Sequence, residues 1–449
     1  MTTDHRDIPA AEQRPTLPRG FRAGVTRAGI KASGNPDLGV IVLEPRGLAP
    51  VAATFTTNRV PAAPVLLSRT HLAATSHDSA GGHGFVSALM STSGSANAAT
   101  GAAGMADQQR LAETLASAAG CAVEATLAVS TGLIGTRLPV DRIVPALDAL
   151  VLDGLTATDE GFAAVAEALR TTDSRAKWAT ATVELPGPAG DLVTVTVSGI
   201  AKGVGMIHPR MATMLSFVLT DAQSDPQTLA AILRPVVART WNQISVDGDT
   251  STNDTVLLVA SGASGAAVAV GDTPAYEGLL LAVGAVARSL ARQQASDGEG
   301  ATTLISCYVR GGRDDAEARA VARAVVSSSL LKAAVHGRDP NWGRIVGACG
   351  NAHLPDAALL ELTGLSAESA HERAGRPVEI DVERLQITIC GTSVFAGAPL
   401  PFDRQAVRQA MDSPEVVIEL ELGSGAGNGE AFGCDLTEAY VIENSEYST

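Results

Sequence analysis

This 449-residue sequence has few aromatic side chains, no closely spaced cysteine pair and no long apolar run. Each of these features limits the classes of protein to which it can belong. Aromatic residues make up only 3% of the chain, whereas hydrophobic residues make up 45% and glycines number 45. This composition is typical of a soluble α/β protein with an Ala/Val/Leu core. The cysteines form no Cys-x-x-Cys pair, which argues against a zinc site and predicts reduced thiols in a cytoplasm. They are Cys121, Cys307, Cys349, Cys390 and Cys434.

No stretch has the character of a membrane span or of a signal peptide. The most apolar helix candidate, Leu279 to Ala287, is far too short to cross a bilayer and ends at Arg288. The first twenty residues carry many charges and have no apolar core of signal-peptide length, so we expect residues 1–19 to form a disordered lead-in. The sequence therefore predicts a cytoplasmic protein that does not contact a membrane.

Positive charge is in deficit, with 33 Lys and Arg against 48 Asp and Glu and a net charge of −15. A general nucleic-acid binder needs a basic face to meet phosphates, so this balance argues against that class. It does not exclude an anionic small substrate, because local charge can oppose the global sign.

What the chain contains is an alternation of strand and helix patterns. Its length corresponds to about three ordinary domains or two large ones. Asp225-Pro226 is a helix start, because an N-cap residue precedes a proline at the first helical position. We predict a layered α/β core followed by a smaller α+β domain at about residues 303–449. Strands are expected at 40–43, 51–55, 85–90, 127–129, 192–198, 214–219, 256–260, 304–309, 385–389, 416–422 and 440–442, and helices at 105–119, 140–150, 162–169, 277–293 and 314–326.

The stretch from Gly199 to Ala222 follows the strand expected at 192–198 and contains the one expected at 214–219, and the rest of the chain is organised around it. Gly203, Gly205 and Pro209 permit or impose uncommon backbone angles in the connection. Thr213 comes immediately before the second strand, so this rigid strand would hold its hydroxyl group at the edge of the loop. That position suits a nucleophile.

Two other stretches superficially resemble phosphate or nucleotide sites. Asp247 to Asp254 (DGDTSTND) has two aspartates after a short strand, but Ser251 stands where a phosphoryl-transfer site has threonine. Its run of Asp, Ser, Thr and Asn favours a turn. Gly423 to Gly429 (GSGAGNG) follows a strand, but its third glycine is misplaced for a dinucleotide fingerprint, which favours a hairpin loop.

Single polar residues offer further candidates. His336 could act as a base, but a loop packed by Trp342, with Asp339 paired to an arginine, explains the same stretch. Glu299 lies between two glycines that allow close approach of a ligand, and an exposed turn is an equally good interpretation. The chain has no Gly-x-Ser-x-Gly elbow of a serine hydrolase.

The segment from Lys202 to Leu215 (KGVGMIHPRMATML) resembles the self-cleavage motif of the ornithine acetyltransferase (ArgJ) family, also called glutamate N-acetyltransferases. Further blocks resemble the family in the same order, from about residue 20 to the last residue. They are 55–59 (FTTNR), 130–135 (STGLIG), 171–173 (TTD), 247–253 (DGDTSTN), 297–301 (DGEGA), 339–344 (DPNWGR), 433–437 (GCDLT) and 444–449 (NSEYST).

The resemblance implies a self-cleaving enzyme of arginine biosynthesis. The Ala212–Thr213 bond would be cut, which leaves an α chain (20–212 after the lead-in) and a β chain (213–449). Thr213 would then carry a free α-amine with a pKa of about 7.7–8.0, able to take the hydroxyl proton at working pH. The implied fold is an αββα sandwich of the DmpA/ArgJ-like N-terminal-nucleophile type, and the implied assembly is α2β2.

The family's site residues carry over to matching positions. Thr131 and Gly132 match the oxyanion hole, where one hydroxyl and one backbone N–H face the developing charge. Five further residues match substrate-binding positions, together with Thr213 itself. Lys202 suits an α-carboxylate and Glu299 an ammonium group, while the others offer hydrogen bonds. The five are Thr171, Lys202, Glu299, Asn444 and Thr449.

The implied reaction has two half-reactions without a metal or organic cofactor. Thr213 takes the acetyl group of N-acetylornithine, and glutamate then removes it. The chain departs from the common family pattern at 92–101 (TSGSANAATG) and at Val204, where the family often has amides, a thiol and a smaller residue. A paralogue that acts on another N-acyl amino acid in secondary metabolism is therefore the first alternative. An aminopeptidase, in which water accepts the acyl group, is the second.

Overall fold

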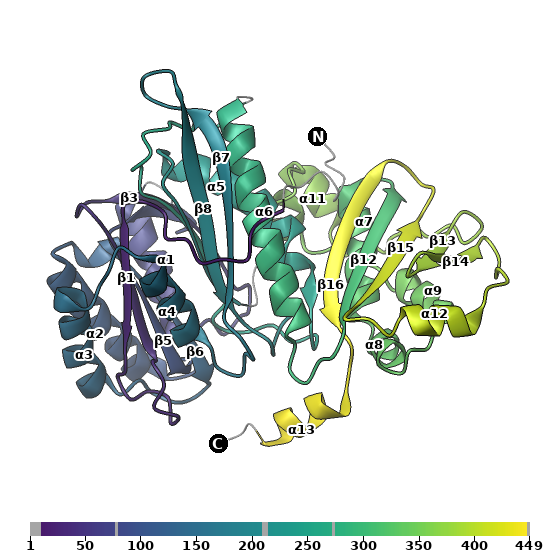
Figure 1. Cartoon of the computed structure of the whole chain (residues 1–449), viewed down its shortest axis with the longest axis horizontal. Helices are drawn as coiled ribbons and strands as arrows, with labels where there is room; N and C mark the ends of the chain where they lie inside the picture. Colours follow the sequence, from purple (N-terminus) through teal and green to yellow (C-terminus); the bar gives the residue numbers. More distant parts are fainter. Residues whose placement is uncertain (1–9, 77–79, 209–213, 272–273, 447–449) are drawn as a thin grey trace.

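Three β-sheets and their helices form the computed structural model, which describes residues 10–76, 80–208, 214–271 and 274–446 (Figure 1). Two of the sheets pack face to face in the N-terminal part of the chain, and the third forms the core of the C-terminal part.

The central sheet has the strand order β4-β3-β11-β9-β8-β7. β8 pairs with β9 in antiparallel fashion, and β9 pairs with β11 in parallel. The segment around residues 203–214 therefore connects two adjacent strands in the middle of this sheet. The strands are β3 (Ala49–Phe55), β4 (His83–Val86), β7 (Lys177–Pro186), β8 (Leu192–Lys202), β9 (Leu215–Thr220) and β11 (Thr255–Ala260).

The second sheet has the order β1-β2-β5-β6, and its inner face shares one hydrophobic core with the central sheet. Its outer face packs against α2 and α3, whereas the outer face of the central sheet packs against α5 and α6. These four layers form the predicted αββα sandwich. Its remaining elements are β1 (Phe21–Thr26), β2 (Leu38–Leu43), α1 (Ala63–Thr75), β5 (Ala88–Ser95), α2 (Gly101–Ala119), η1 (Val123–Ala125), β6 (Thr126–Leu133), α3 (Val140–Asp153), α4 (Asp159–Leu169), α5 (Pro226–Arg239), η2 (Trp241–Gln243) and α6 (Pro274–Ser296).

The third sheet has the order β10-β16-β12-β15-β13-β14 and a separate core drawn from residues 305–431. Helices α7 to α12 accompany it, and α13 extends below it in Figure 1. The elements are β10 (Ile244–Ser245), β12 (Leu304–Gly312), α7 (Asp315–Ser327), α8 (Ser329–His336), α9 (Trp342–Gly350), α10 (Ala357–Glu361), α11 (Ala367–Arg373), β13 (Gln386–Ile389), β14 (Thr392–Ala396), α12 (Arg404–Ala410), β15 (Glu415–Glu421), β16 (Gly427–Cys434) and α13 (Glu438–Glu446).

Local sequence signals explain several element boundaries. Asp225 caps α5 as expected, because its Oδ1 accepts a hydrogen bond from Thr228 N at 2.9 Å. Two expectations for the C-terminal part are wrong. Residues 440–442 belong to helix α13, where the Thr437 hydroxyl accepts a hydrogen bond from Tyr440 N at 3.2 Å and caps the first turn. The loop 423–429 is no hairpin, because β15 and β16 pair with opposite edges of β12.

Residues 10–19, which we expected to be part of a disordered lead-in, run beside β7. Glu12 N donates to Thr180 O at 2.8 Å, and Thr180 N donates back to Glu12 O at 2.8 Å. Arg19 forms an ion pair with Asp221 at 2.9 Å. Backbone pairing and one buried carboxylate thus hold this part of the chain on the sandwich.

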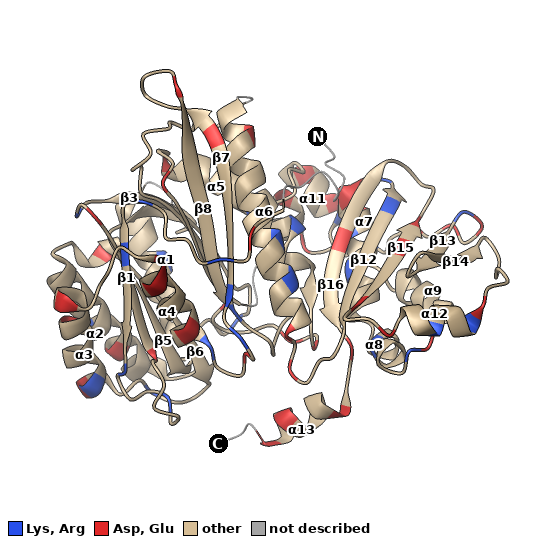
Figure 2. Cartoon of the chain, viewed as in Figure 1, with Lys and Arg blue, Asp and Glu red and all other residues tan. Residues whose placement is uncertain are grey.

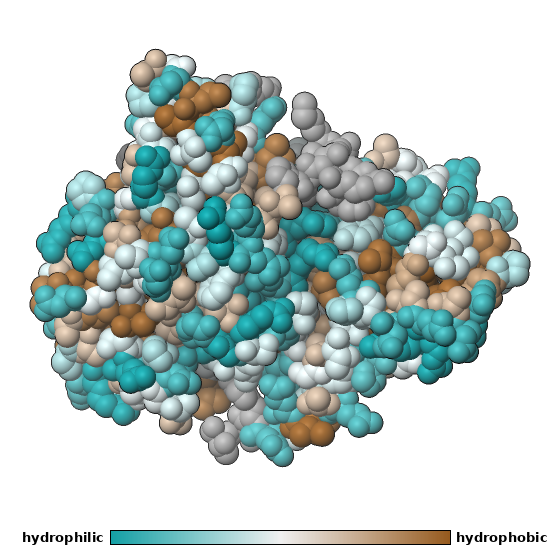
Figure 3. All heavy atoms as spheres, in the orientation of Figure 1, coloured by the Kyte–Doolittle hydropathy of each residue, from teal (hydrophilic) through white to brown (hydrophobic). Residues whose placement is uncertain are grey.

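Charge pairs join α6 of the sandwich to the third sheet. Figure 2 shows basic residues on α6 facing an acidic residue on β16. Arg288 forms an ion pair with Glu430 at 2.7 Å, and Arg292 forms one with Glu415 at 2.8 Å. On the face drawn in Figure 3, hydrophobic residues form small separate groups. Within the described ranges, no helix combines the length and apolar character needed to cross a membrane.

Candidate active site

One cavity of about 520 Å³ collects six of the residues predicted from the sequence. Strand β6, the end of β8, and the loops after α4 and α6 contribute to its wall, as does helix α13. Of the other predicted residues, Ala212, Thr213 and Thr449 lie outside the described residues. The six in the cavity are Thr131, Gly132, Thr171, Lys202, Glu299 and Asn444.

Gly132 occupies a position that only glycine fits. Its φ angle is +124°, in the region that other residues avoid. A Cβ atom there would lie 2.3 Å from the carbonyl carbon of Gly94 on the neighbouring strand β5. The close approach of two parallel strands therefore sets the backbone of β6 at the cavity wall and fixes the direction of its polar groups.

Thr131 receives a hydrogen bond from the Lys202 ammonium group, with 3.0 Å between Nζ and Oγ1. A threonine hydroxyl has two acceptor lone pairs and one donor hydrogen. Because Lys202 occupies a lone pair, the hydroxyl hydrogen of Thr131 can donate to a group in the cavity. Burial lowers the pKa of Lys202, and Asp173 opposes this effect.

A buried ionic network lies beneath this pair, and only part of it stood out in the sequence. Lys177 Nζ donates to Asp173 Oδ1 at 2.7 Å and to Asp297 Oδ2 at 2.6 Å, and its side chain is fully buried. Asp173 Oδ1 also accepts from Gly203 N at 2.8 Å. Burial raises the pKa of Asp173, but Lys202 and Lys177 outweigh it and bring the pKa to about 2. The network ties the start of β7 to the loops that carry Gly203 and Glu299.

The carboxylate of Glu299 is held on both sides. Thr172 Oγ1 donates to Oε1 at 2.8 Å, and Asn444 Nδ2 donates to Oε2 at 2.9 Å. A Cβ atom on Gly205 would lie 2.2 Å from Oε2, so glycine leaves room for the carboxylate. Thr171 also lines the cavity, and its backbone N donates to Asp173 Oδ2 at 3.3 Å. Sequence reasoning missed Thr172, although it lies within the block at 171–173.

The stretch from Asp247 to Asp254 is a turn, as its composition predicted. Asp247 accepts hydrogen bonds from Met206 N at 2.5 Å and Ile207 N at 2.9 Å, which fixes the loop that follows β8. Asn253 Nδ2 donates to Ala96 O at 2.6 Å and Ser130 O at 2.9 Å. This turn therefore fixes the loop after β8, and its residues Ser251, Thr252 and Asn253 form part of the cavity wall.

The residues from the end of α8 onward contact other parts of the C-terminal region. Asp339 pairs with Arg404, as the sequence suggested, and Trp342 packs on Phe395 with ring centroids 5.2 Å apart. His336 Nδ1 lies 3.1 Å from Asp435 Oδ2. None of these residues lines the cavity that holds Thr131 and Lys202.

The cavity can bind a zwitterion. Lys202 provides a positive group, Glu299 provides a negative one, and the Thr131 hydroxyl lies beside the positive group. Leu215, the first residue of β9, pairs with Lys202 in the ladder and follows Thr213 by two residues in the chain.

The chain is similar to known proteins over nearly its whole length. A model of the ArgJ family matches residues 22–449. The arginine biosynthesis bifunctional protein ArgJ of Thermus thermophilus is 44% identical over 433 residues, or 96% of this chain and 99% of the relative. Its namesake from Synechococcus is 42% identical over 443 residues, or 97% of each chain. A crystal structure of ornithine acetyltransferase complexed with ornithine, from Mycobacterium tuberculosis, is 36% identical, with a TM-score of 0.37, and covers 44% of this chain and 96% of that one.

Proposed function

Because the chain belongs to the ArgJ family, we propose that it moves an acetyl group from N-acetylornithine to glutamate through an acetyl-threonine intermediate. It is an acyltransferase of the ornithine acetyltransferase type with small amino-acid substrates. The observation that supports the proposal most is the common cavity of Lys202, Glu299, Thr131 and Gly132.

The proposed nucleophile is Thr213 after cleavage of the Ala212–Thr213 bond. Cleavage frees an α-amine with a pKa of about 7.7–8.0, so a useful fraction is neutral near pH 8. That neutral amine takes the proton of the threonine hydroxyl as the hydroxyl oxygen attacks. Before cleavage the same nitrogen belongs to an amide and cannot accept a proton, so the uncut chain is inactive.

In the first half-reaction, the Thr213 hydroxyl oxygen bonds to the acetyl carbonyl carbon of N-acetylornithine. The oxyanion that forms accepts hydrogen bonds from the Thr131 hydroxyl and the Gly132 N–H. Lys202, hydrogen-bonded to Thr131 Oγ1 at 3.0 Å, adds positive charge beside it. The C–N bond then breaks, and ornithine leaves with the proton held by the Thr213 ammonium group.

In the second half-reaction, the amine of glutamate attacks the acetyl-threonine ester. The same donors stabilise the second oxyanion. The C–O bond then breaks, and the proton that the glutamate amine loses passes through the α-amine of Thr213 to its hydroxyl oxygen. Lys202 meets the α-carboxylate that both substrates carry, whereas Glu299 meets the side-chain ammonium group of ornithine. The two substrates therefore use one cavity in turn, which is the condition for ping-pong kinetics.

The proposal is tested by trapping the intermediate. Purified protein is mixed with N-acetylornithine without glutamate, quenched in acid and examined by intact mass spectrometry. We expect the β chain to gain about 42 Da, one acetyl group, and to lose it when glutamate is added. Thr213→Ala should gain nothing, whereas Thr114→Ala, which changes a partly exposed threonine on α2, should behave as the unaltered protein. Single-displacement kinetics with an unmodified β chain would contradict the mechanism.

The departures at 92–101 support a second candidate, a paralogue with another N-acyl amino acid as donor. Two of the altered positions make contacts of their own: Thr92 Oγ1 lies 2.7 Å from Ser130 Oγ, and Ser95 Oγ donates to Thr136 O at 2.7 Å. A panel of N-acyl amino acids, with acetyl-CoA as a further donor, separates the two candidates by kcat/KM. Steady acetate release without glutamate would instead assign water as the acceptor.

A further inference from the structure

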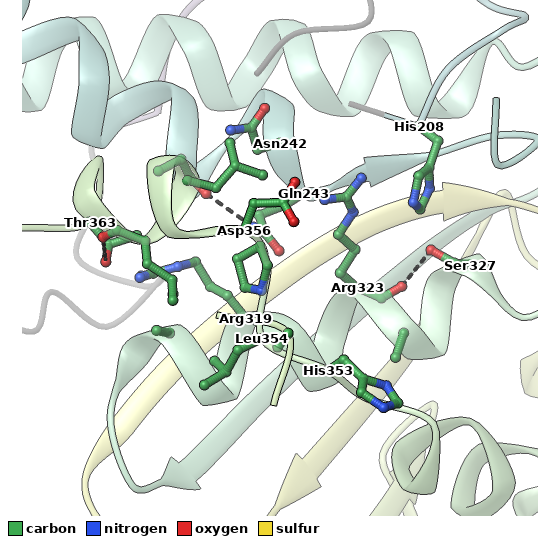
Figure 4. Close-up of a pocket in the computed structure, with 18 of the residues that line it drawn as sticks. His208, Asn242, Gln243, Arg319, Arg323, Ser327, His353, Leu354, Asp356 and Thr363 are labelled. Atoms are coloured by element: carbon green, nitrogen blue, oxygen red, sulfur yellow. Dashed lines mark hydrogen bonds between the residues drawn. The ribbon is translucent and has the colours of Figure 1, made fainter. Parts of the chain in front are cut away.

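A second cavity, of about 410 Å³, lies between α7, η2 and the segment 351–363 (Figure 4). It shares no lining residue with the candidate active site. Figure 4 shows Arg323 extending from α7 toward Gln243 and His208, and Arg319 pointing toward Thr363. Asp356 is the one carboxylate among its described lining residues, so the wall is basic in a chain whose net charge is −15.

The face of α7 explains why this cavity is open. Arg319 and Arg323 are four residues apart, so they lie on the same side of the helix. Alanines at 316, 320 and 324 repeat at the same spacing and leave space between the long side chains. Leu354, Leu359 and Leu360 also line the cavity. The cavity therefore has both guanidinium groups and an apolar surface.

Arg319 is the residue whose bonding is incomplete. Only 8% of its side chain is exposed, and its ion-pair partner, Asp315, lies 3.8 Å away. Among the described residues, no hydrogen bond joins its guanidinium group to another side chain or to the backbone. Burial lowers its pKa to about 10, and Arg239 acts in the same direction against Asp315. A buried guanidinium group carries five N–H donors, and leaving them without acceptors is unfavourable.

We propose that this cavity binds a small carboxylate with an apolar body, whose carboxylate lies against Arg319 and whose body lies against the leucines. A carboxylate offers two oxygens that match the planar N–H fork of arginine. The apolar wall adds affinity for a chain or ring that a bare anion lacks.

The cavity is connected to the candidate active site by the loop that follows β8. His208 lines the second cavity, while Gly205 and Met206 of the same loop line the first. His208 Nδ1 lies 3.0 Å from Ser245 Oγ, and its carbonyl oxygen accepts from Thr250 Oγ1 at 3.0 Å. A ligand that contacts His208 therefore stabilises the arrangement of residues 203–208, because binding favours the state to which it binds.

Calorimetric titration of the full-length protein with hexanoate and with hexanamide tests the proposal. The two probes have the same carbon skeleton, and only hexanoate carries the negative charge. We expect hexanoate to bind at least tenfold more tightly. Arg319→Met should weaken hexanoate by at least tenfold, whereas Arg408→Met, at an exposed position on α12, and Lys202→Met, in the other cavity, should leave it unchanged. Equal affinity for both probes, or an unchanged affinity in Arg319→Met, would overturn the proposal.

Two readouts on the unaltered protein keep the test independent of how Arg319→Met folds. Hexanoate should shift the histidine NMR signals of His208 and His353, which line the cavity, and leave that of His71, which is bonded to Thr126 O in the sandwich core. Hydrogen exchange of peptides that cover residues 203–208 should slow when hexanoate is bound. Shifts confined to His71, or exchange that is unaffected at saturation, would place the ligand elsewhere.

Discussion

Replacing Glu299 by glutamine should separate the two substrates of the proposed reaction. Glutamine has nearly the same volume as glutamate, and an amide oxygen can still accept the hydrogen bond from Thr172 Oγ1 or Asn444 Nδ2. The change therefore removes one negative charge and leaves the cavity wall in place. We expect the melting temperature to change by no more than about 2 °C.

The magnitude follows from the charge of each substrate's side chain. N-acetylornithine carries a side-chain ammonium group, and a hydrogen bond to a charged group contributes about 1.5–3 kcal/mol. Losing this hydrogen bond should weaken the binding of the acetyl donor, N-acetylornithine, by about 10- to 150-fold, because 1.4 kcal/mol corresponds to about a factor of ten in affinity. Glutamate carries a side-chain carboxylate instead, which Glu299 repels when both are ionised. The KM for glutamate should therefore stay the same or fall.

Initial rates of acetyl transfer, with both substrates varied, give the two KM values separately. Glu438→Gln, at the exposed start of α13, is the matched control and should leave both unchanged. An equal rise of both KM values in Glu299→Gln would show that the residue only maintains the shape of the cavity. An unchanged KM for N-acetylornithine would remove Glu299 from donor binding altogether.

Substitutions at three further positions probe the oxyanion site, the buried network and a buried acid. Thr131→Val should lower kcat about 100- to 1,000-fold with little change in KM, whereas Thr131→Ser should retain most of the rate, as steady-state kinetics on processed enzyme can measure. Lys177→Met leaves Asp173 and a second buried carboxylate without their cation and should destabilise the fold by about 3–5 kcal/mol in urea unfolding; an effect below about 1 kcal/mol would contradict this reading. Burial raises the pKa of Asp254 well above its usual range, so native stability falls as the pH rises above about 4, where the unfolded carboxyl ionises. Asp254→Asn should therefore gain stability over the unaltered protein between pH 5 and pH 8, and an equal difference at both pH values would show that this carboxyl is not protonated in the fold.

The sequence predicted secondary structure best where a local pattern is typical of only one kind of element. Asp225 followed by proline marked the start of α5, and the alternation in 192–198 marked β8. The resemblance to the family then identified Thr131, Lys202 and other residues as members of a site, and they line one cavity. The strand and helix patterns are local, and the family blocks occur in the same order as in the family. Both can therefore be recognised without knowing which elements pack together.

Contacts between distant segments could not be predicted in this way. Lys177 stands in an ordinary strand pattern, and only the structure reveals that Asp173 and Asp297 meet it from two different loops. Thr172 is one of two adjacent threonines, and its side chain, not that of Thr171, bonds to Glu299. Residues 440–442 look strand-like because of their types, but α13 buries no side chain, so no amphipathic pattern marked the helix.

Intact mass spectrometry of the purified protein tests the central claim most directly. The account predicts two chains, residues 1–212 and 213–449, with threonine at the start of the second, and a single uncut chain in Thr213→Ala. A single full-length chain in the unaltered protein that nevertheless transfers acetyl groups would contradict it, because the amine of Thr213 would then still be an amide and could not act as the base.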